Sequence, residues 1–172
     1  MSLGFIRVRP LPACRSRGVM VAGGLTIPVA LGRAGIKANK REGDGATPAG
    51  AFRPVRLWWR ADRGPPPAGV LPIRRIRPDD AWSEDPRERN YNRPMRIGAQ
   101  HGDRLWRQDR LYDLVVEIDH NRCPRIAGRG SAVFIHVARS GLSPTAGCVA
   151  MTLGNLRRLV ARLGPQTRIV IG

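Results

Sequence analysis

One continuous stretch carries most of the information on fold and chemistry: Ile135-His136-Val137-Ala138-Arg139-Ser140-Gly141-Leu142-Ser143-Pro144-Thr145-Ala146-Gly147-Cys148-Val149-Ala150-Met151. The run Ala132–Val137 at its start is rich in β-branched and aromatic residues, which predicts a buried strand that ends near His136. A loop rich in Gly, Ser and Pro follows and leads to Cys148. A histidine and a cysteine therefore bracket one loop, and a loop that doubles back can bring their side chains into contact.

An imidazole beside a thiol is the usual arrangement of a cysteine nucleophile and its base. A free thiol has a pKa of about 8.5 and becomes nucleophilic only as the thiolate, so a nearby base must take its proton. We therefore interpret Cys148 as the candidate nucleophile and His136 as the candidate base. The spacing alone leaves an alternative open, a core histidine and a buried structural thiol.

The residues around Cys148 favour the catalytic interpretation. Gly147 permits a sharp turn that would aim the amides of Gly147 and Cys148 at a developing oxyanion, and Thr145 belongs to the same turn. One such donor typically contributes about 3 kcal/mol to transition-state stabilisation. We also expect a helix to begin just after Cys148, whose N-terminus would lower the pKa of the thiol.

Outside this stretch the patterns predict mainly strands. Thr152 is a candidate cap for the one clear helix, whose apolar face ends before Gly164-Pro165. The predicted strands are Phe5–Val8, Val19–Ala22, Thr26–Leu31, Phe52–Trp59, Leu111–Ile118, Ala132–Val137 and Thr167–Ile171. Gly23-Gly24 predicts a hairpin turn. The chain of 172 residues is expected to form one domain, residues 1–172, mainly β with one or two helices.

The segment 78–94 is dense in charge and has neither helical nor strand periodicity, which predicts a long ordered loop. Tyr91 and Asn92 within it are candidates for lining a substrate groove, because an aromatic ring beside an amide suits contacts with sugars or peptides. Tyr112 is another candidate, but its position in a predicted strand favours a place in the core.

Two separated motifs give the chain a family resemblance. His136 followed by Thr145-Ala146-Gly147-Cys148-Val149-Ala150-Met151 resembles the signature of the L,D-transpeptidase catalytic domain of the YkuD type, Ser/Thr-x-Gly-Cys-Val-x-Met/Leu. The earlier segment Asp44–Phe52 resembles the Thr-Pro-x-Gly-x-Phe segment of that family. Together the motifs frame the chain from about Gly35 to its C-terminus, so the resemblance covers most of it.

The resemblance implies a β-sandwich-like fold of mixed sheets and a peptidoglycan L,D-transpeptidase that needs no metal or organic cofactor. Cys148 would attack the bond between the L-centre of a diamino acid and the terminal D-alanine of a stem tetrapeptide, forming a thioester. His136 would take the thiol proton and return it to the leaving amine. An amine from a second stem peptide would complete the cross-link, whereas water would make the protein an L,D-carboxypeptidase or another amide hydrolase.

The sequence departs from the commoner family pattern at Val137, Ala146 and Ala150, where Gly or Ser, His and Arg are usual. These departures concern the choice of acceptor. If the missing arginine normally anchors a substrate carboxylate, Arg139 on the same loop is the candidate to replace it, because a guanidinium binds a carboxylate through two hydrogen bonds.

The charge of the chain points to anionic partners. The formal net charge is +17 and the pI is about 11.7, which favours contact with polyanions. The basic residues are spread along the chain and interleaved with acidic ones, so no specific nucleic-acid partner is expected. A non-catalytic polyanion-binding module remains an alternative, and its binding would survive Cys148→Ala.

Further expectations concern partners and location. Cys14, Cys123 and Cys148 cannot all pair within one chain, and His101 and His120 lack partners at metal-ligand spacing, so no metal site is predicted. No apolar run reaches the ~20 residues needed to span a membrane, and the first residues do not resemble a signal peptide. The family resemblance nevertheless implies work in the cell envelope or periplasm. The sequence does not determine the oligomeric state.

Overall fold

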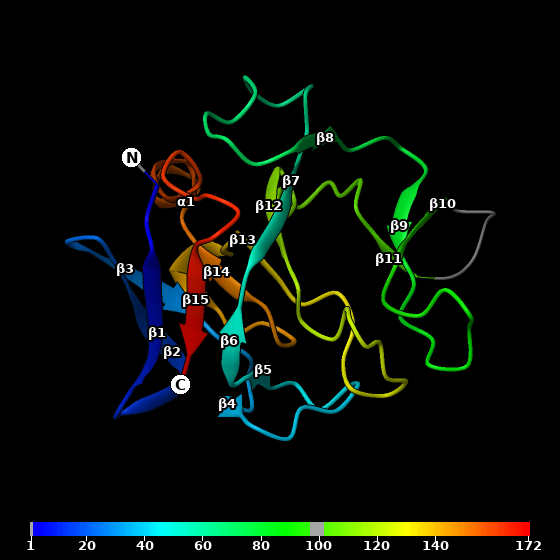
Figure 1. Ribbon diagram of the computed structural model, residues 1–172, viewed down its shortest axis with the longest axis horizontal. Helices are drawn as coiled ribbons and strands as arrows, with labels where there is room; N and C mark the ends of the chain where they lie inside the picture. Colours follow the sequence, from blue (N-terminus) through cyan, green and yellow to red (C-terminus); the bar gives the residue numbers. More distant parts are fainter. Residues whose placement is uncertain (1, 97–101) are drawn as a thin grey trace.

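A computed structural model describes residues 2–96 and 102–172. It is mostly β, with one α-helix and a short 3₁₀ turn, as predicted (Figure 1). The elements are β1 (Phe5–Leu11), β2 (Cys14–Ala22), β3 (Leu25–Ala30), β4 (Ile36–Lys37), β5 (Thr47–Pro48), β6 (Gly50–Phe52), β7 (Pro54–Trp59), β8 (Ile73–Arg75), β9 (Asp80–Trp82), β10 (Pro94–Arg96), β11 (Asp103–Arg104), β12 (Leu114–Ile118), β13 (Phe134–Val137), η1 (Ser140–Leu142), β14 (Val149–Met151), α1 (Leu153–Val160) and β15 (Arg168–Ile171).

The main sheet is mixed and curled. Its strand order is β6-β15-β1-β2-β3-β14-β13-β12-β7-β8, and the pairs β1/β15, β13/β14 and β7/β8 are parallel. Only Arg53 separates β6 at one edge from β7 near the other edge. The sheet must therefore bend until its two ends approach, which confirms a β-sandwich-like fold of mixed sheets. The predicted single strand Phe52–Trp59 is in fact divided between these two ends.

The hydrophobic core lies inside the curled sheet. Because side chains alternate along a strand, every second residue of a strand points into this core. Leu114, Val116 and Ile118 of β12 join the main hydrophobic cluster, whereas Val115 joins a second cluster on the opposite face. Helix α1 packs against β12 and β13 and buries Leu156, Leu159 and Val160. Full burial of an aliphatic side chain of this size contributes about 1.5–3 kcal/mol, so the helix is held by packing more than by its own eight residues.

Two local predictions hold and two need correction. The Gly23-Gly24 hairpin joins β2 to β3, and both glycines have positive φ (52° and 84°). Thr152 caps α1 by accepting a hydrogen bond from the Asn155 amide. The segment 78–94, predicted as loop throughout, contains β9, which pairs with β10 and β11. Helix α1 starts at Leu153, directly after the predicted cap, but the unpredicted strand β14 separates it from Cys148, so the expectation that the helix begins just after Cys148 needs correction.

The second cluster lies between the main sheet and the small sheet β10-β9-β11, which Figure 1 shows at the side away from β1 and β15. It contains Trp58, Trp82, Tyr112, Phe134 and Cys148. Three T-shaped ring pairs link its aromatic members, the closest being Trp82 and Phe134 with centroids 4.9 Å apart. Cys148 is therefore placed at the edge of a rigid aromatic cluster.

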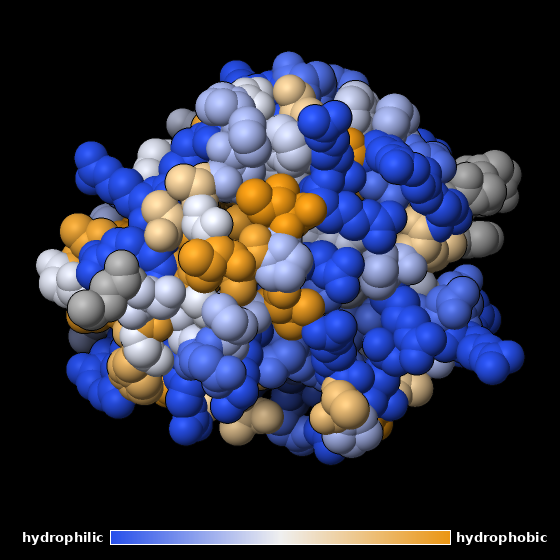
Figure 2. Space-filling model, turned by 45° about the horizontal axis from the view of Figure 1, so that its top comes forward, coloured by the Kyte–Doolittle hydropathy of each residue, from blue (hydrophilic) through white to orange (hydrophobic). Residues whose placement is uncertain are grey.

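The face shown in Figure 2 is largely hydrophilic, with hydrophobic residues gathered near its middle. This agrees with the strongly basic composition. Among the described residues, no helix is long and apolar enough to cross a membrane.

Candidate active site

Strand pairing places Cys148 and His136 on one face of the main sheet. His136 pairs with Ala150 and Ile135 with Val149 in the parallel pair β13/β14. Because side chains alternate along a strand, Cys148 faces the same side as Ala150, and therefore the same side as His136. The thiol lies one level along the strands from the imidazole, beside Phe134, whose amide donates a hydrogen bond to Cys148 Sγ at 3.3 Å.

Both side chains line one cavity of about 270 Å³. A second cavity of about 290 Å³ also reaches Cys148. The two share Glu84, Asp103, Tyr112, Ala146 and Cys148. Thr145 and Arg139 line the first cavity and Gly147 lines the second. The structure thus gathers the predicted residues of the histidine-to-cysteine stretch around one thiol.

The orientation of His136 fixes its tautomer. Its Nδ1 lies 2.9 Å from the Val137 carbonyl oxygen. A carbonyl can only accept a hydrogen bond, so Nδ1 carries the proton and Nε2 of the neutral ring is a hydrogen-bond acceptor. Burial lowers the pKa of His136 to about 4, and the nearby Arg107 and Arg139 charges act in the same direction. At neutral pH the ring is therefore an uncharged base.

The thiol of Cys148 is also uncharged at rest. Burial raises its pKa to about 12, and the carboxylates of Asp103 and Glu84 add to the effect against the opposing hydrogen bond from the Phe134 amide. Sγ donates to the Ala132 carbonyl at 3.2 Å. The prediction that a helix N-terminus lowers the pKa of this thiol is wrong, since β14 separates Cys148 from α1.

Thr145 holds the turn that precedes the thiol. Its hydroxyl donates to the Cys148 carbonyl at 2.7 Å and accepts from the Gly147 amide at 3.1 Å. Gly147 has φ of 151°, and a Cβ there would lie 2.8 Å from the Ala46 carbonyl oxygen. The turn therefore requires glycine. It also engages the Gly147 amide, which we had predicted to face an oxyanion.

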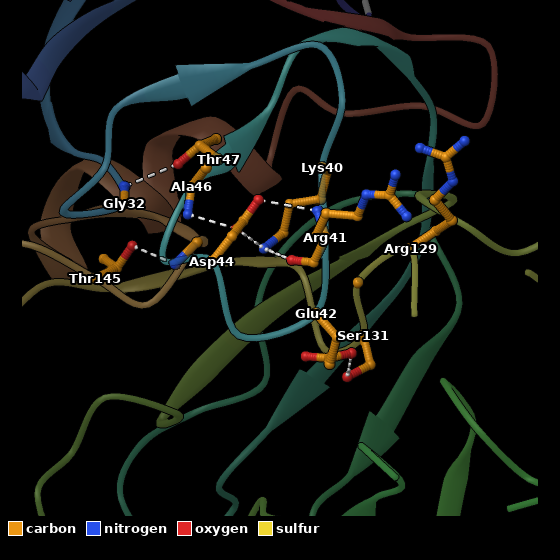
Figure 3. A network of polar contacts seen from close by, with 12 residues as sticks. Gly32, Lys40, Arg41, Glu42, Asp44, Ala46, Thr47, Arg129, Ser131 and Thr145 are labelled. Atoms are coloured by element: carbon orange, nitrogen blue, oxygen red, sulfur yellow. Dashed lines mark hydrogen bonds and ion pairs between the residues drawn. The ribbon is translucent and has the colours of Figure 1, made fainter. Parts of the chain in front are cut away.

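The second family motif packs against this turn (Figure 3). Asp44 organises it: Oδ1 accepts from Lys40 Nζ at 2.5 Å and from the Ala46 amide at 2.8 Å, and Oδ2 accepts from the Arg41 amide at 2.9 Å. Burial alone would raise the pKa of Asp44, but these hydrogen bonds outweigh it and lower the pKa. Thr47 accepts from the Gly32 amide at 2.8 Å. The motif thereby brings the Ala46 carbonyl to Gly147.

A polar network beside the cavity was not predicted. The Tyr112 hydroxyl donates to Asp103 at 2.5 Å, and Arg107 bridges Asp103 and Asp109. The Tyr112 ring also meets the His136 ring edge to face, with centroids 5.3 Å apart. Arg139 Nη2 lies 3.5 Å from Asp109 Oδ2, so this arginine is oriented toward the same network. Tyr112 therefore belongs both to the core, as expected, and to the cavity wall.

Glu84, which lines both cavities that reach Cys148, was also not predicted from the sequence. Partial burial, together with the charges of Asp103 and Glu42, raises its pKa to about 7. Asp103, Arg107 and Glu84 lie in segments without periodicity, where nothing in the sequence marks one charged residue over another. Only the tertiary arrangement of the small sheet identifies them.

Tyr91 and Asn92 are placed away from both cavities that reach Cys148. Both side chains are buried. Tyr91 donates to Glu42 and accepts from the Gly130 amide, and Asn92 accepts from the Trp82 indole at 2.9 Å. The prediction that they line the substrate groove is therefore not supported by their position, because their polar groups are used within the fold.

Nothing in the described part of the chain groups three His, Cys, Asp or Glu residues in a way that would hold a metal ion. His120 contacts the Arg129 carbonyl through Nε2 at 3.1 Å, and His101 lies outside the described residues. Cys14, Cys123 and Cys148 are all free thiols.

Comparison with known proteins agrees with this geometry. The family model of the L,D-transpeptidase catalytic domain, YkuD, matches residues 15–171. No curated protein and no solved structure gave a match. The matched range includes Asp44–Phe52, His136 and Cys148, so both motifs and the strands that carry them lie within it. On this match over nearly the whole chain, the protein belongs to the L,D-transpeptidase catalytic domain family.

Proposed function

We propose that the protein is a peptidoglycan L,D-transpeptidase in which Cys148 is the nucleophile and His136 the general base. The observation that carries the proposal is the cavity lined by both side chains, with His136 held by Val137 so that its unprotonated Nε2 is the acceptor. Family membership supports a transferase acting on peptidoglycan.

Acylation follows from this arrangement. The thiol rotates away from the Ala132 carbonyl, its proton passes to His136 Nε2, and sulfur attacks the carbonyl of the scissile bond. The C–N bond then breaks and the proton goes to the nitrogen of the departing D-alanine, which leaves a thioester on Cys148. In the second half, an acceptor amine gives a proton to Nε2 and displaces the thiolate sulfur, which takes the proton back.

The two pKa values determine the timing of the proton transfer. Moving a proton from a thiol of pKa about 12 to an imidazole of pKa about 4 costs on the order of 10 kcal/mol before the attraction between the new charges is counted. A stable thiolate–imidazolium pair is therefore not expected in the free protein. Proton transfer should accompany attack on the carbonyl, when the substrate completes the site.

Arg139 is the proposed contact for a substrate carboxylate. It lines the cavity, its side chain is 57% exposed, and its guanidinium lies 3.5 Å from an Asp109 carboxylate oxygen. A guanidinium fixed in this way can still present donors to a carboxylate. The free carboxylate of the terminal D-alanine is the substrate group proposed for it.

Product analysis tests the proposal. A purified disaccharide-tetrapeptide is incubated with the protein, and the products are separated by mass spectrometry. Cross-linked dimer with release of D-alanine is the result expected of a transpeptidase, and tripeptide without dimer would show that water, not an amine, resolves the thioester. Absence of both products from wild type, or their formation by Cys148→Ala, would contradict the proposal. We also propose that the protein works in the cell envelope or periplasm, since peptidoglycan is its proposed substrate.

A further inference from the structure

Three arginines converge at a place separate from the active site. Arg93, Arg122 and Arg125 all line two neighbouring cavities of about 300 and 470 Å³. Neither cavity shares a lining residue with the two that reach Cys148. We call Arg93, Arg122 and Arg125 the arginine cluster.

No carboxylate of the described residues is in ion-pair contact with the arginine cluster, although Asp119 lines the larger cavity and accepts a hydrogen bond from the Arg53 amide there. Many other arginines lie within 4.0 Å of a carboxylate, and Arg56, which lines the smaller cavity, is 3.2 Å from Glu117. Within residues 2–96 and 102–172, no ion pair involves a member of the cluster. Burial, and then the charges of Arg93 and Arg122, lower the pKa of Arg125. An anion bound there would relieve this repulsion.

The side chains of half-buried Asn121 and buried Asn92 hold the cluster in place. Asn121 donates to the carbonyls of Ile126 and Gly130 at 2.9 and 3.0 Å and accepts from the Ile126 amide at 2.8 Å, which closes the loop that carries Arg122 and Arg125. Asn92, directly before Arg93, donates to the Asn121 carbonyl at 2.8 Å. The two loops are therefore tied together.

The contact between Arg125 and Asn92 completes this arrangement. Arg125 Nε donates to the Asn92 carbonyl at 3.4 Å, which orients the guanidinium. Because these contacts within the protein already order the two loops, binding would require little further ordering of them. The two amides thus organise a site, which gives Asn92 a role other than the substrate contact expected from the sequence.

We propose that the arginine cluster binds a phosphate group, borne either by a free phosphomonoester or by a lipid headgroup. A guanidinium pairs with two phosphate oxygens at once, and three converging cations match a group that carries up to two negative charges better than a single carboxylate. The cluster is compact and confined to two loops, whereas a nucleic-acid surface extends along several phosphates.

Titration of the full-length protein with inorganic phosphate at low salt tests the site. We expect Arg93→Gln/Arg122→Gln to raise the Kd for phosphate at least tenfold. The matched control is Arg9→Gln/Arg158→Gln, which removes the same two charges from exposed positions on β1 and α1, and its Kd should change less than twofold. Equal weakening in both double variants would show diffuse attraction by net charge and would overturn the proposal.

Vesicle sedimentation then identifies the source of the phosphate. Vesicles containing phosphatidic acid are compared with pure phosphatidylcholine vesicles, for wild type and both double variants. Cluster-dependent binding of the phosphatidic acid vesicles identifies a lipid headgroup, and cluster-dependent binding of inorganic phosphate alone identifies a soluble phosphomonoester. If wild type binds neither probe, or binds duplex DNA with equal losses in both double variants, the proposal is wrong. Both double variants should retain thioester formation at Cys148.

Discussion

His136 and Ala150 lie opposite each other in the parallel pair β13/β14, so Cys148, two residues before Ala150, faces the same cavity as the imidazole. The pairing register of β13 and β14 therefore determines where the nucleophile lies relative to the base. A shift by one residue would turn Cys148 to the opposite face.

The neutral state of buried His136 predicts a stability that depends on pH. Its pKa is about 4 in the folded protein against an ordinary value of 6.5 for an exposed histidine, so between these values the unfolded chain binds more protons. Stability should then fall as the pH drops from about 6.5 to about 4, by about 3 kcal/mol from this group. Denaturant unfolding of wild type and His136→Gln across this range measures the contribution.

The difference between the two proteins isolates His136 from other groups that titrate in the same range. Glu84 and Asp103 have raised pKa values and act with the opposite sign, but they are present in both proteins. Identical pH profiles for wild type and His136→Gln would contradict the buried, neutral imidazole.

Gly147 is predicted to tolerate no side chain. Gly147→Ala would combine a strained positive φ with a contact of 2.8 Å to the Ala46 carbonyl, and we expect a loss of about 2–3 kcal/mol in the free energy of unfolding. The rate of acylation should fall as well, because the turn positions Cys148. Gly154→Ala, where a Cβ meets nothing within 4 Å, is the control and should change stability by under about 1 kcal/mol. Equal effects at the two positions would refute the close approach.

We predict that Asp44 supports the active site by holding the loop that brings the Ala46 carbonyl to Gly147. Asp44→Asn keeps the size of the side chain but weakens its hydrogen bonds to Lys40 and two backbone amides, and should cost about 1–3 kcal/mol. The kcat should fall more than KM rises. Asp79→Asn removes half of an exposed ion pair with Arg96 and should leave stability nearly unchanged. Unchanged kcat and KM in Asp44→Asn would show that the segment Asp44–Phe52 does not support the stretch that carries Cys148.

Arg139 is predicted to bind a substrate carboxylate. Arg139→Ala should raise the KM for tetrapeptide about tenfold, with a smaller change in kcat, because one charge-assisted contact contributes about 1.5–3 kcal/mol. Arg110→Ala removes an arginine whose carboxylate partner, Asp113, lies outside the cavity, and should leave KM unchanged. An unchanged KM in Arg139→Ala would assign this residue to the Asp109 contact alone.

Local patterns in the sequence were sufficient to predict most of the fold. The Gly23-Gly24 turn, the Thr152 cap and the buried strand ending near His136 depend on neighbouring residues, and each is present. The division of Phe52–Trp59 between two ends of the sheet was not predicted, because a strand pattern in one short segment does not reveal that the sheet curls. The three residues of β14 were also missed, since the helical pattern after them begins almost at once.

The site residues that lie in one continuous stretch of sequence could be predicted. Those that distant segments contribute could not. His136, Cys148, Thr145 and Gly147 belong to one stretch and were identified together. Asp103, Arg107 and Glu84 come from segments that approach Cys148 only in the folded protein. The resting pKa of the thiol was predicted in the wrong direction, because burial in an aromatic cluster cannot be inferred from a helix that follows in sequence.

Intact-mass spectrometry of the protein after brief incubation with a stem tetrapeptide tests the central proposal most directly. The account predicts a covalent adduct equal to the donor peptide less D-alanine, mapped by digestion to Cys148, absent from Cys148→Ser and strongly reduced in His136→Gln. An adduct on Cys14 or Cys123, or turnover that persists in Cys148→Ser, would contradict it.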